Sequence, residues 1–462
     1  MKLPFWKKTS PTNVDDEDAA DLARYRAGMP SERPPVGQLP PQDWLQWPET
    51  QAVITALQAS GQQVRFVGGC VRDALCGRAV HDIDIATPDG PETVMGLLER
   101  AGIRAIPTGI AHGTVTAVLG GRHFEITTLR EDVACDGRHA TVAWTRDWMM
   151  DAARRDFTIN ALSASPDGAV YDYFDGIPHL AHGRVRFIGR PDDRIAEDYL
   201  RILRYFRFYA RYGAGAPNRA ALAACRAAAP HMVELSGERV QGEILKILAT
   251  PLAADVVALM IGEKILDALL PELRDVGRLR QVIFLETRGL QLDGIRPDPL
   301  RRLAAALPSG PAAVETIEAV TRRLRMSRAD AARVLAISQV QATPAFDASP
   351  QEHWRALRRS GGPLAVDRLL LAWAQWRAQE GRVSSRVTEG YRRCLEQALS
   401  WQPVPFPLAG RDLLALGIPA GPALGAVLRE VEVWWEERDG VPDGPALQAE
   451  ALRRWQGIPA IM

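Results

Sequence analysis

The sequence predicts an α+β protein with an N-terminal head, built from a mixed sheet and helices, followed by an all-helical neck, body and tail. Short β-branched and aromatic runs, separated by Gly-rich turns, occur between residues 64 and 171. Residues 251–462 are instead rich in Ala, Leu and Arg, with Pro and Gly between amphipathic helical patterns. A length of 462 residues corresponds to about three domains of ordinary size.

The predicted domain boundaries follow these changes in composition. We expect a polar N-terminal arm at 1–48, the head at 49–180, a helical neck at 181–255, and a helical body and tail at 256–462. The arm is rich in Pro and acidic residues, so it is predicted to pack loosely.

Charge and cysteine content restrict the class of protein. Lys and Arg total 56, as do Asp and Glu, so a nucleic-acid partner would be held by local basic patches. Residues 181–213 form such a patch, with eight Arg against four acidic residues. The five Cys are too scattered for a zinc site or a disulfide framework. The first fifteen residues contain no long apolar run of the kind found in a signal peptide, and no stretch approaches a membrane span. We therefore predict a cytoplasmic protein with no membrane partner.

The segment Val64–Thr87 reads as a strand, a Gly-Gly turn, a short helix and a second strand that carries two carboxylates. Gly69 lets the backbone approach a ligand closely, and Arg72 offers a charge-assisted bond to a triphosphate. Asp82 and Asp84 are two apart on a strand, so both point to the same side. Their repulsion is relieved by a hard divalent cation such as Mg²⁺. Taken singly, a Gly-Gly pair is usually a turn and an Asp-x-Asp pair a solvated strand end.

Two further segments continue the head. Residues 114–119 and 123–128 read as strands around a Gly-Gly turn, which places Glu125 as a candidate third carboxylate or, equally, as an exposed edge residue. Residues 130–150 are polar with little periodicity and are predicted to form a loop. Arg155 is expected to contact phosphate or ribose, with Asp156 and Asn160 holding the local turn through side-chain to backbone bonds.

The segment Glu197–Arg211 has apolar residues at helical spacing and a broad polar face. A solvated basic face is the ordinary explanation. Asp198 and Arg201, however, are one turn apart and offer a hydrogen-bond acceptor beside a donor. That pair complements the amino group and ring nitrogen of cytosine and adenine. Guanine and uracil present a carbonyl instead, so this helix is predicted to accept C and A and to reject G and U.

The ordered pattern GG-x-VRD-x-L-x-G followed by D-x-D resembles the head of the tRNA nucleotidyltransferase and poly(A) polymerase superfamily, in the class that includes bacterial and eukaryotic CCA-adding enzymes. Residues 154–162, 171–180, 197–211 and 231–248 resemble further motifs in the expected order. The resemblance implies a five-stranded nucleotidyltransferase-type sheet and a mobile loop at 130–150 beside the nucleotide pocket. It also implies that Arg204 and Arg207 are ligands of the triphosphate and of the nucleotide pocket, and that residues 236–239 brace the head against the next domain.

The function implied by the resemblance is transfer of CMP and AMP from CTP and ATP to the 3′ end of tRNA, with two Mg²⁺ ions at Asp82 and Asp84. Arg211 and the glycine-rich turn of the tail, at Gly417 and Gly421, are expected to contact RNA, although a purely structural turn explains these glycines equally well. Poly(A) polymerases and enzymes that add only CC or only A share nearly all of these motifs. An inactive RNA-binding relative is the third alternative, and the paired carboxylates argue against it.

Overall fold

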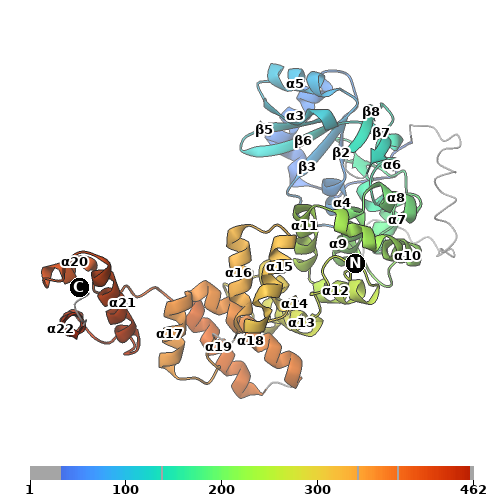
Figure 1. Cartoon of the computed structure of the whole chain (residues 1–462). Helices are drawn as coiled ribbons and strands as arrows, with labels where there is room; N and C mark the ends of the chain where they lie inside the picture. Colours follow the sequence, from blue (N-terminus) through green and yellow to red (C-terminus); the bar gives the residue numbers. More distant parts are fainter. Residues whose placement is uncertain (1–32, 137–138, 341–342, 382–383, 458–462) are drawn as a thin grey trace. The chain divides into compact units, whose positions relative to one another are not determined.

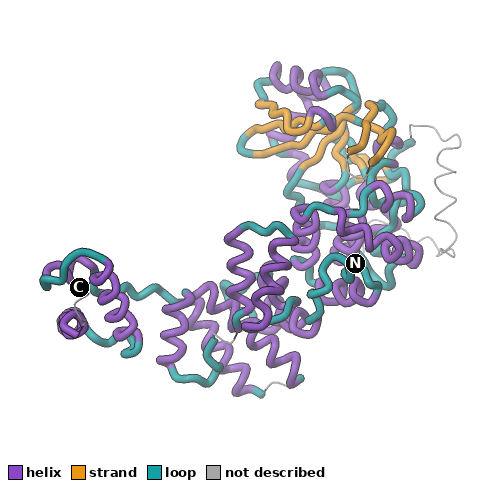
Figure 2. The backbone as a smooth tube through the Cα atoms, in the orientation of Figure 1, coloured by secondary structure: helices purple, strands orange, loops and turns teal. Residues whose placement is uncertain are grey.

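The computed structural model describes residues 33–136, 139–340, 343–381 and 384–457. The chain divides into two compact units, Met1–Pro271 and Glu272–Met462, which are described separately. All the strands of the described residues lie in the first unit, and the second unit is helical (Figure 1, Figure 2). Within the described residues, no helix is both long enough and apolar enough to cross a bilayer.

The head contains an eight-stranded mixed sheet in the order β1-β10-β9-β2-β3-β6-β5-β4. Its strands are β1 (Gly37–Gln38), β2 (Arg65–Val67), β3 (Ile83–Thr87), β4 (Arg104–Gly109), β5 (Thr114–Leu119), β6 (Arg122–Thr128), β9 (Ser163–Ala164) and β10 (Ala169–Tyr171). All of the pairs are antiparallel except β3 with β6. The expectation of five strands was therefore too small. The predicted arm also ends too late, because β1 pairs with β10 and belongs to the head.

Side-chain alternation along β3 and β6 fixes the orientation of the sheet. Ile83, Ile85, Phe124 and Ile126 are at most 4% exposed and form one face of this strand pair. Helix α5 (Pro91–Arg100) packs on β4, β5 and β6 and against α3 (Pro48–Gln58). Both helices lie beside the sheet in Figure 1. The residues between the isoleucines therefore point to the other face, which is where the carboxylates lie.

Residues 130–136 and 139–144 do not form the predicted irregular loop. They form an antiparallel hairpin of β7 (Arg130–Asp136) and β8 (His139–Trp144), separate from the main sheet. Helix α6 (Trp148–Ala153) follows, and its Trp148 and Met149 pack in one buried cluster with Ala86 of β3. Because Ala86 and Asp84 are two residues apart on one strand, α6 lies on the face to which Asp84 points.

The remainder of the first unit is mainly helical. Its other elements are α2 (Asp43–Gln46), α4 (Gly69–Leu75), η1 (Ile110–His112), η2 (Thr158–Asn160), α7 (Gly176–Ala181), α8 (Pro191–Glu197), α9 (Leu200–Tyr212), α10 (Arg219–Ala228), η3 (Ala229–Glu234), α11 (Gly237–Leu248) and α12 (Ala253–Gly262). Helix α9 packs against α8, α11 and α12. The predicted continuous helix from Glu197 is wrong, because α8 ends there and Asp198 is extended, with φ −160°.

The second unit consists of helices. They are α13 (Val276–Phe284), the π-helix η4 (Leu285–Gly289), α14 (Pro299–Ala306), η5 (Pro311–Ala313), α15 (Val314–Arg323), α16 (Arg328–Ser338), α17 (Pro350–Ser360), α18 (Gly362–Glu380), α19 (Ser385–Leu399), α20 (Gly410–Ala415), α21 (Pro422–Glu436) and α22 (Gly444–Gly457). A buried cluster centred on Trp435 joins α20, α21 and α22. Arg358 of α17 contacts Glu432 and Glu436 of α21 at 2.7 and 3.0 Å.

Candidate active site

Two carboxylates stand side by side on one face of the head sheet, and a third lies just before the strand that carries one of them. Asp84 lies in the middle of β3, and Asp82 is exposed just before that strand. Glu125 stands directly beside Asp84, because β3 and β6 are parallel and pair these two residues. Glu125 is exposed, yet it is not on an edge strand, since β5 covers the far side of β6.

Burial and neighbouring charges shift the pKa of Asp84. Burial and repulsion by Glu125 raise the pKa of Asp84 to about 6, with a further contribution from Asp82 and opposition from Arg155 and Arg72. A bound divalent cation would relieve this repulsion. In the described part of the chain, no group of three His, Cys, Asp or Glu side chains is arranged to hold a metal by itself. Asp82 and Asp84 therefore suit a cation that takes its other ligands from substrate phosphates and water, as Mg²⁺ commonly does.

The Gly-Gly turn leads into α4, with Gly68 as the N-cap and Gly69 as the first residue of the helix. Gly68 has φ +68°, and a Cβ there would come within 3.0 Å of the Arg155 guanidinium, so this position requires glycine. At Gly69, φ is not positive and a Cβ would meet only the tip of Arg72 at 3.7 Å. The turn therefore requires glycine at Gly68, one residue before the predicted candidate Gly69.

A hydrogen-bonded network links three segments of the first unit. The buried Arg72 donates to the Asn160 side chain, and Asn160 donates to Asp156 at 2.9 Å. Asp156 also accepts from its neighbouring backbone N–H of Phe157 at 2.9 Å, as predicted for this turn, and from Arg204 at 2.6 Å. Although burial alone would raise it, the pKa of Asp156 is lowered by Arg204 and Asn160. The network thus fixes the guanidinium groups of Arg72 and Arg204.

Arg155 is held in a different way. Its guanidinium donates to Asp151 of α6 at 3.0 Å and approaches the backbone carbonyl of Asn160 at 3.5 Å. Its charge acts on Asp84, whose pKa it lowers against the stronger effects of burial and Glu125. Arg155 therefore acts electrostatically on the carboxylate site, while its contact with phosphate or ribose stays a prediction.

Asp198 and Arg201 lie at the junction of α8 and α9. One Asp198 carboxylate oxygen accepts from the backbone N–H of Leu200 at 3.1 Å, and the other accepts from Arg239 of α11 at 2.6 Å. Arg201 donates to Glu197 and to the carbonyl of Arg194. The acceptor and the donor proposed to read a base are thus each oriented by a neighbouring charged residue.

A cavity of about 580 Å³ opens beside the carboxylates. Asp82, Asp84, Gly69 and Arg72 line it, together with the residues Cys70, Asp73, Arg78, Ala79, Val80, His81, Arg207, Phe208, Arg211, Tyr212, Lys246, Ala249, Thr250 and Pro251. Arg207 forms an ion pair with Glu243 at 2.9 Å, and Arg211 approaches Asp73 at 3.6 Å. Arg155, Asp198, Arg201 and Arg204 do not line this cavity, so the candidate residues fall into two adjoining groups.

The structure adds residues that the sequence did not single out for this site. Arg239 and Glu197 orient the proposed base-reading pair, and Arg78 and Lys246 line the cavity. Arg239 had been expected only as a structural brace. Lys246 could have been identified from the sequence as a basic residue on the same helix face as Arg239, because the two are seven residues, or about two helical turns, apart.

The predicted RNA-contacting glycines lie in the second unit. Gly417 and Gly421 connect α20 to α21 and have φ +82° and +149°. A Cβ at either position would meet no atom within 4 Å, so these glycines serve the backbone conformation and not close packing. Their contact with RNA stays a prediction.

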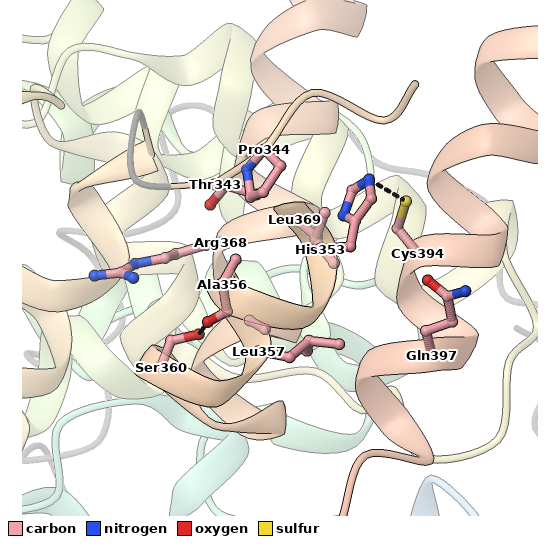
Figure 3. Close-up of a pocket in the computed structure, with 11 residues that line it drawn as sticks. Thr343, Pro344, His353, Ala356, Leu357, Ser360, Arg368, Leu369, Cys394 and Gln397 are labelled. Atoms are coloured by element: carbon pink, nitrogen blue, oxygen red, sulfur yellow. Dashed lines mark hydrogen bonds between the residues drawn. The ribbon is translucent and has the colours of Figure 1, made fainter. Parts of the chain in front are cut away.

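A second pair of reactive residue types, Cys394 and His353, lies in the second unit (Figure 3). The thiol sulfur is 3.6 Å from Nε2 of the imidazole. Burial raises the pKa of Cys394 and lowers that of His353, so both are neutral at pH 7. The adjoining cavity measures about 20 Å³, enough for one water molecule. The pair is therefore a packing contact and not a nucleophile with its base.

Family models match two segments of the chain. Residues 64–186 match the family model of the poly(A) polymerase head domain, and residues 218–276 match the model described as the probable RNA and SrmB-binding site of polymerase A. The fold also resembles solved structures, which cover about nine tenths of this chain. They include the Bacillus stearothermophilus CCA-adding enzyme in complex with CTP (TM-score 0.68, 24% identity, 89% of this chain and 98% of the other). The Thermotoga maritima CCA-adding enzyme complexed with tRNA has a TM-score of 0.59 and 19% identity, over 91% of this chain and 100% of the other.

Sequence relatives extend over most of both chains. The mitochondrial CCA tRNA nucleotidyltransferase 1 of Danio rerio is 35% identical over 384 residues, which cover 81% of this chain and 84% of the relative. The Homo sapiens protein of the same name is 33% identical over 415 residues, with 85% and 89% covered. The Levilactobacillus brevis CCA-adding enzyme is 30% identical over 404 residues, with 82% and 91% covered. The chain therefore belongs to the family of CCA tRNA nucleotidyltransferases.

Proposed function

We propose that this protein adds the nucleotides C, C and A to the 3′ end of tRNA from CTP and ATP, and releases pyrophosphate. The observation that carries the proposal is the pairing of Asp84 with Glu125 on one sheet face, next to a cavity that Asp82, Asp84 and several cationic side chains line. Family membership selects tRNA as the acceptor. The predicted cytoplasmic location stays a prediction.

Asp82 and Asp84 are the residues that would hold Mg²⁺. The raised pKa of Asp84 and the proximity of Glu125 fit a site that a dication completes. The chemistry supplied by divalent cations at such a pair is activation of the RNA 3′-hydroxyl and neutralisation of the departing pyrophosphate. Glu125 then adds to the negative potential that attracts the cation.

The remaining residues position the two substrates. Arg72, Arg155 and Arg204 orient the triphosphate, since each guanidinium is fixed by a carboxylate or amide that leaves donors free. Arg207 adds positive charge beside Gly69 in the cavity. The attacking oxygen displaces pyrophosphate from the α-phosphorus, so one phosphodiester bond forms as one phosphoanhydride bond breaks.

Product length tests this function directly. The purified protein is incubated with a tRNA transcript that lacks CCA, Mg²⁺, and CTP alone, ATP alone or both. We expect two added residues with CTP alone, three with both nucleotides, and little extension with ATP alone. A long ladder from ATP would indicate a poly(A) polymerase, and arrest at two residues with both nucleotides would indicate a CC-adding enzyme.

Replacement of Asp198 by Ala is expected to weaken base selection. The variant lacks the acceptor for the amino group of C and A, and an unsatisfied buried group is worth about 1–3 kcal/mol. Discrimination against UTP and GTP should therefore fall by roughly ten- to a hundredfold, measured as the ratio of kcat/KM values. Arg239→Ala should cause a smaller loss, because Asp198 remains but loses its 2.6 Å partner.

The matched control is Arg226→Ala, which removes an exposed neck arginine paired with Glu263. This variant should keep wild-type selectivity. Unchanged selectivity in Asp198→Ala would show that the junction of α8 and α9 does not read bases.

A further inference from the structure

We propose that Lys246, Arg78 and Arg211 form a binding wall for the backbone phosphates next to the 3′ end of the acceptor RNA. The inference rests on the proposed function, because it assigns the second substrate of that same site. All three residues line the cavity that also contains Asp82 and Asp84.

The lining separates into residues that the nucleotide explains and residues that it does not. Gly69, Arg72 and Arg207 are assigned to the triphosphate, and the base-reading residues Asp198 and Arg201 lie outside the lining. Arg78, Arg211 and Lys246 have no part in that assignment. Because the reaction joins two substrates at the carboxylate pair, the second polyanion must reach the same cavity.

The two arginines of the wall are held in place by Tyr212 and Asp73. Arg78 donates to the carbonyl of Arg211 at 2.7 Å, and its guanidinium lies 4.7 Å from the centre of the Tyr212 ring. Asp73 accepts from the Tyr212 hydroxyl and lies 3.6 Å from Arg211. Both guanidinium groups keep donors that are free to bind phosphate oxygens.

Lys246 is exposed on α11 and has no carboxylate within ion-pair distance among the described residues. The acidic residue one turn earlier, Glu243, is buried and already pairs with Arg207. Lysine is also rare in this chain, with five residues (Lys2, Lys7, Lys8, Lys246 and Lys264) against 51 arginines. The only other lysine of the described residues, Lys264, does not line the cavity. An unpaired ammonium group in a cavity beside the reaction centre is suited to a mobile phosphodiester.

The rarity of lysine makes the proposal directly testable. A tRNA that ends in CC is oxidised with periodate, which converts its terminal ribose to a dialdehyde, and is incubated with the full-length protein. The imine formed with a lysine is reduced with borohydride, and the labelled peptide is identified by mass spectrometry. We expect label on Lys246 and none on Lys264, and unmodified tRNA should compete for it.

Periodate-oxidised CTP serves as the second arm. Labelling of Lys246 by oxidised CTP but not by oxidised tRNA would overturn the proposal and assign the wall to the nucleotide. Labelling by oxidised tRNA elsewhere, in a protein that incorporates CMP normally, would also overturn it. Absence of incorporation by the wild-type protein would instead contradict the proposed function.

Binding measurements provide an independent readout. Lys246→Gln and Arg78→Gln should each weaken tRNA binding by roughly fivefold, as expected for an exposed charge contact. The slope of log Kd against log salt concentration should fall by about 0.7 in each variant. The KM for CTP should stay unchanged, and Lys264→Gln should bind tRNA like the wild type. An altered KM for CTP with unchanged tRNA binding would overturn the assignment.

Discussion

Replacement of Asp84 by Asn is expected to abolish nucleotide incorporation while the fold is kept. The substitution preserves the shape of the side chain but removes the charge that would hold a cation. Metal-assisted stabilisation of the transition state is worth several kcal/mol, so a loss of at least about a thousandfold in rate follows. Asp82→Asn should show a similar loss. The measurement is single-turnover incorporation of CMP into tRNA that lacks CCA.

The fold itself should tolerate this change. Asp84 lies on the face opposite Ile83 and Ile85, which form the buried side of β3, and its charge is destabilised by burial and by Glu125. Removal of that charge should therefore leave stability unchanged or slightly raised. Glu92→Gln, an exposed carboxylate in the first turn of α5, is the matched control and should retain full activity. Incorporation at the wild-type rate by Asp84→Asn would refute the catalytic assignment.

Removal of Glu286 is expected to have the largest effect on stability. Its carboxylate is fully buried in the second unit and accepts from Arg301 at 2.6 Å and from Arg302 at 2.7 Å. Arg302 is also almost fully buried. Removal of one partner of a buried ion pair costs about 3–5 kcal/mol, because the other charge loses its compensation. Glu286→Ala should therefore greatly destabilise the second unit.

The effect can be located by hydrogen exchange of the full-length protein. Amides of α13, α14 and α18 should exchange faster in Glu286→Ala, whereas those of the head sheet should not. Glu396→Ala is the control, since its pair with Arg392 is more than half exposed on both sides and contributes little. Glu286→Gln, which keeps the shape and an acceptor, should fall between the two. Equal exchange in all three variants would show that the buried pair does not support these helices.

The part of the site that follows from local pattern was predictable. A β-branched run, a Gly-Gly turn and an alternating strand are signals within about 25 residues, and the structure has β2, α4 and β3 at these positions. The alternation rule placed Ile83 and Ile85 in the core and Asp84 opposite them, as observed. The parallel pairing that brings Glu125 beside Asp84 involves a separation of about 40 residues, so periodicity could only offer it as a candidate.

Two local features were not predicted from the sequence, the hairpin of β7 and β8 and the break at Asp198. The hairpin is separate from the main sheet, and its first strand carries the charged residues Arg130, Glu131, Asp132 and Asp136. The alternation of Ala140, Val142 and Trp144 in its second strand is short and was not recognised. An Asp136-Gly137 pair in the sequence is a hairpin signal that could have indicated it. The break at Asp198 was missed because the apolar spacing continues across it, while the side chain of Asp198 binds the N–H of Leu200 instead.

The tertiary network could not be derived from spacing at all. Arg72, Asn160 and Arg204 come from three distant segments and meet through Asp156. The sequence showed that these side chains are charged or polar, but such side chains can have several roles and their partners were not evident. Only the packing of α9 against the head selects these partners.

The ion pair between Arg239 and Asp198 affects how this enzyme can change during evolution. In the proposed assignment, Asp198 contacts the incoming base. Arg239 extends from α11 and contacts the carboxylate of Asp198, not the base. Substitutions at the supporting position can therefore shift the orientation of the acceptor while the metal-binding carboxylates on the sheet stay as they are. Nucleotide selectivity and catalytic rate then depend on different residues. Selectivity can therefore increase or decrease during evolution without substitution of the catalytic carboxylates.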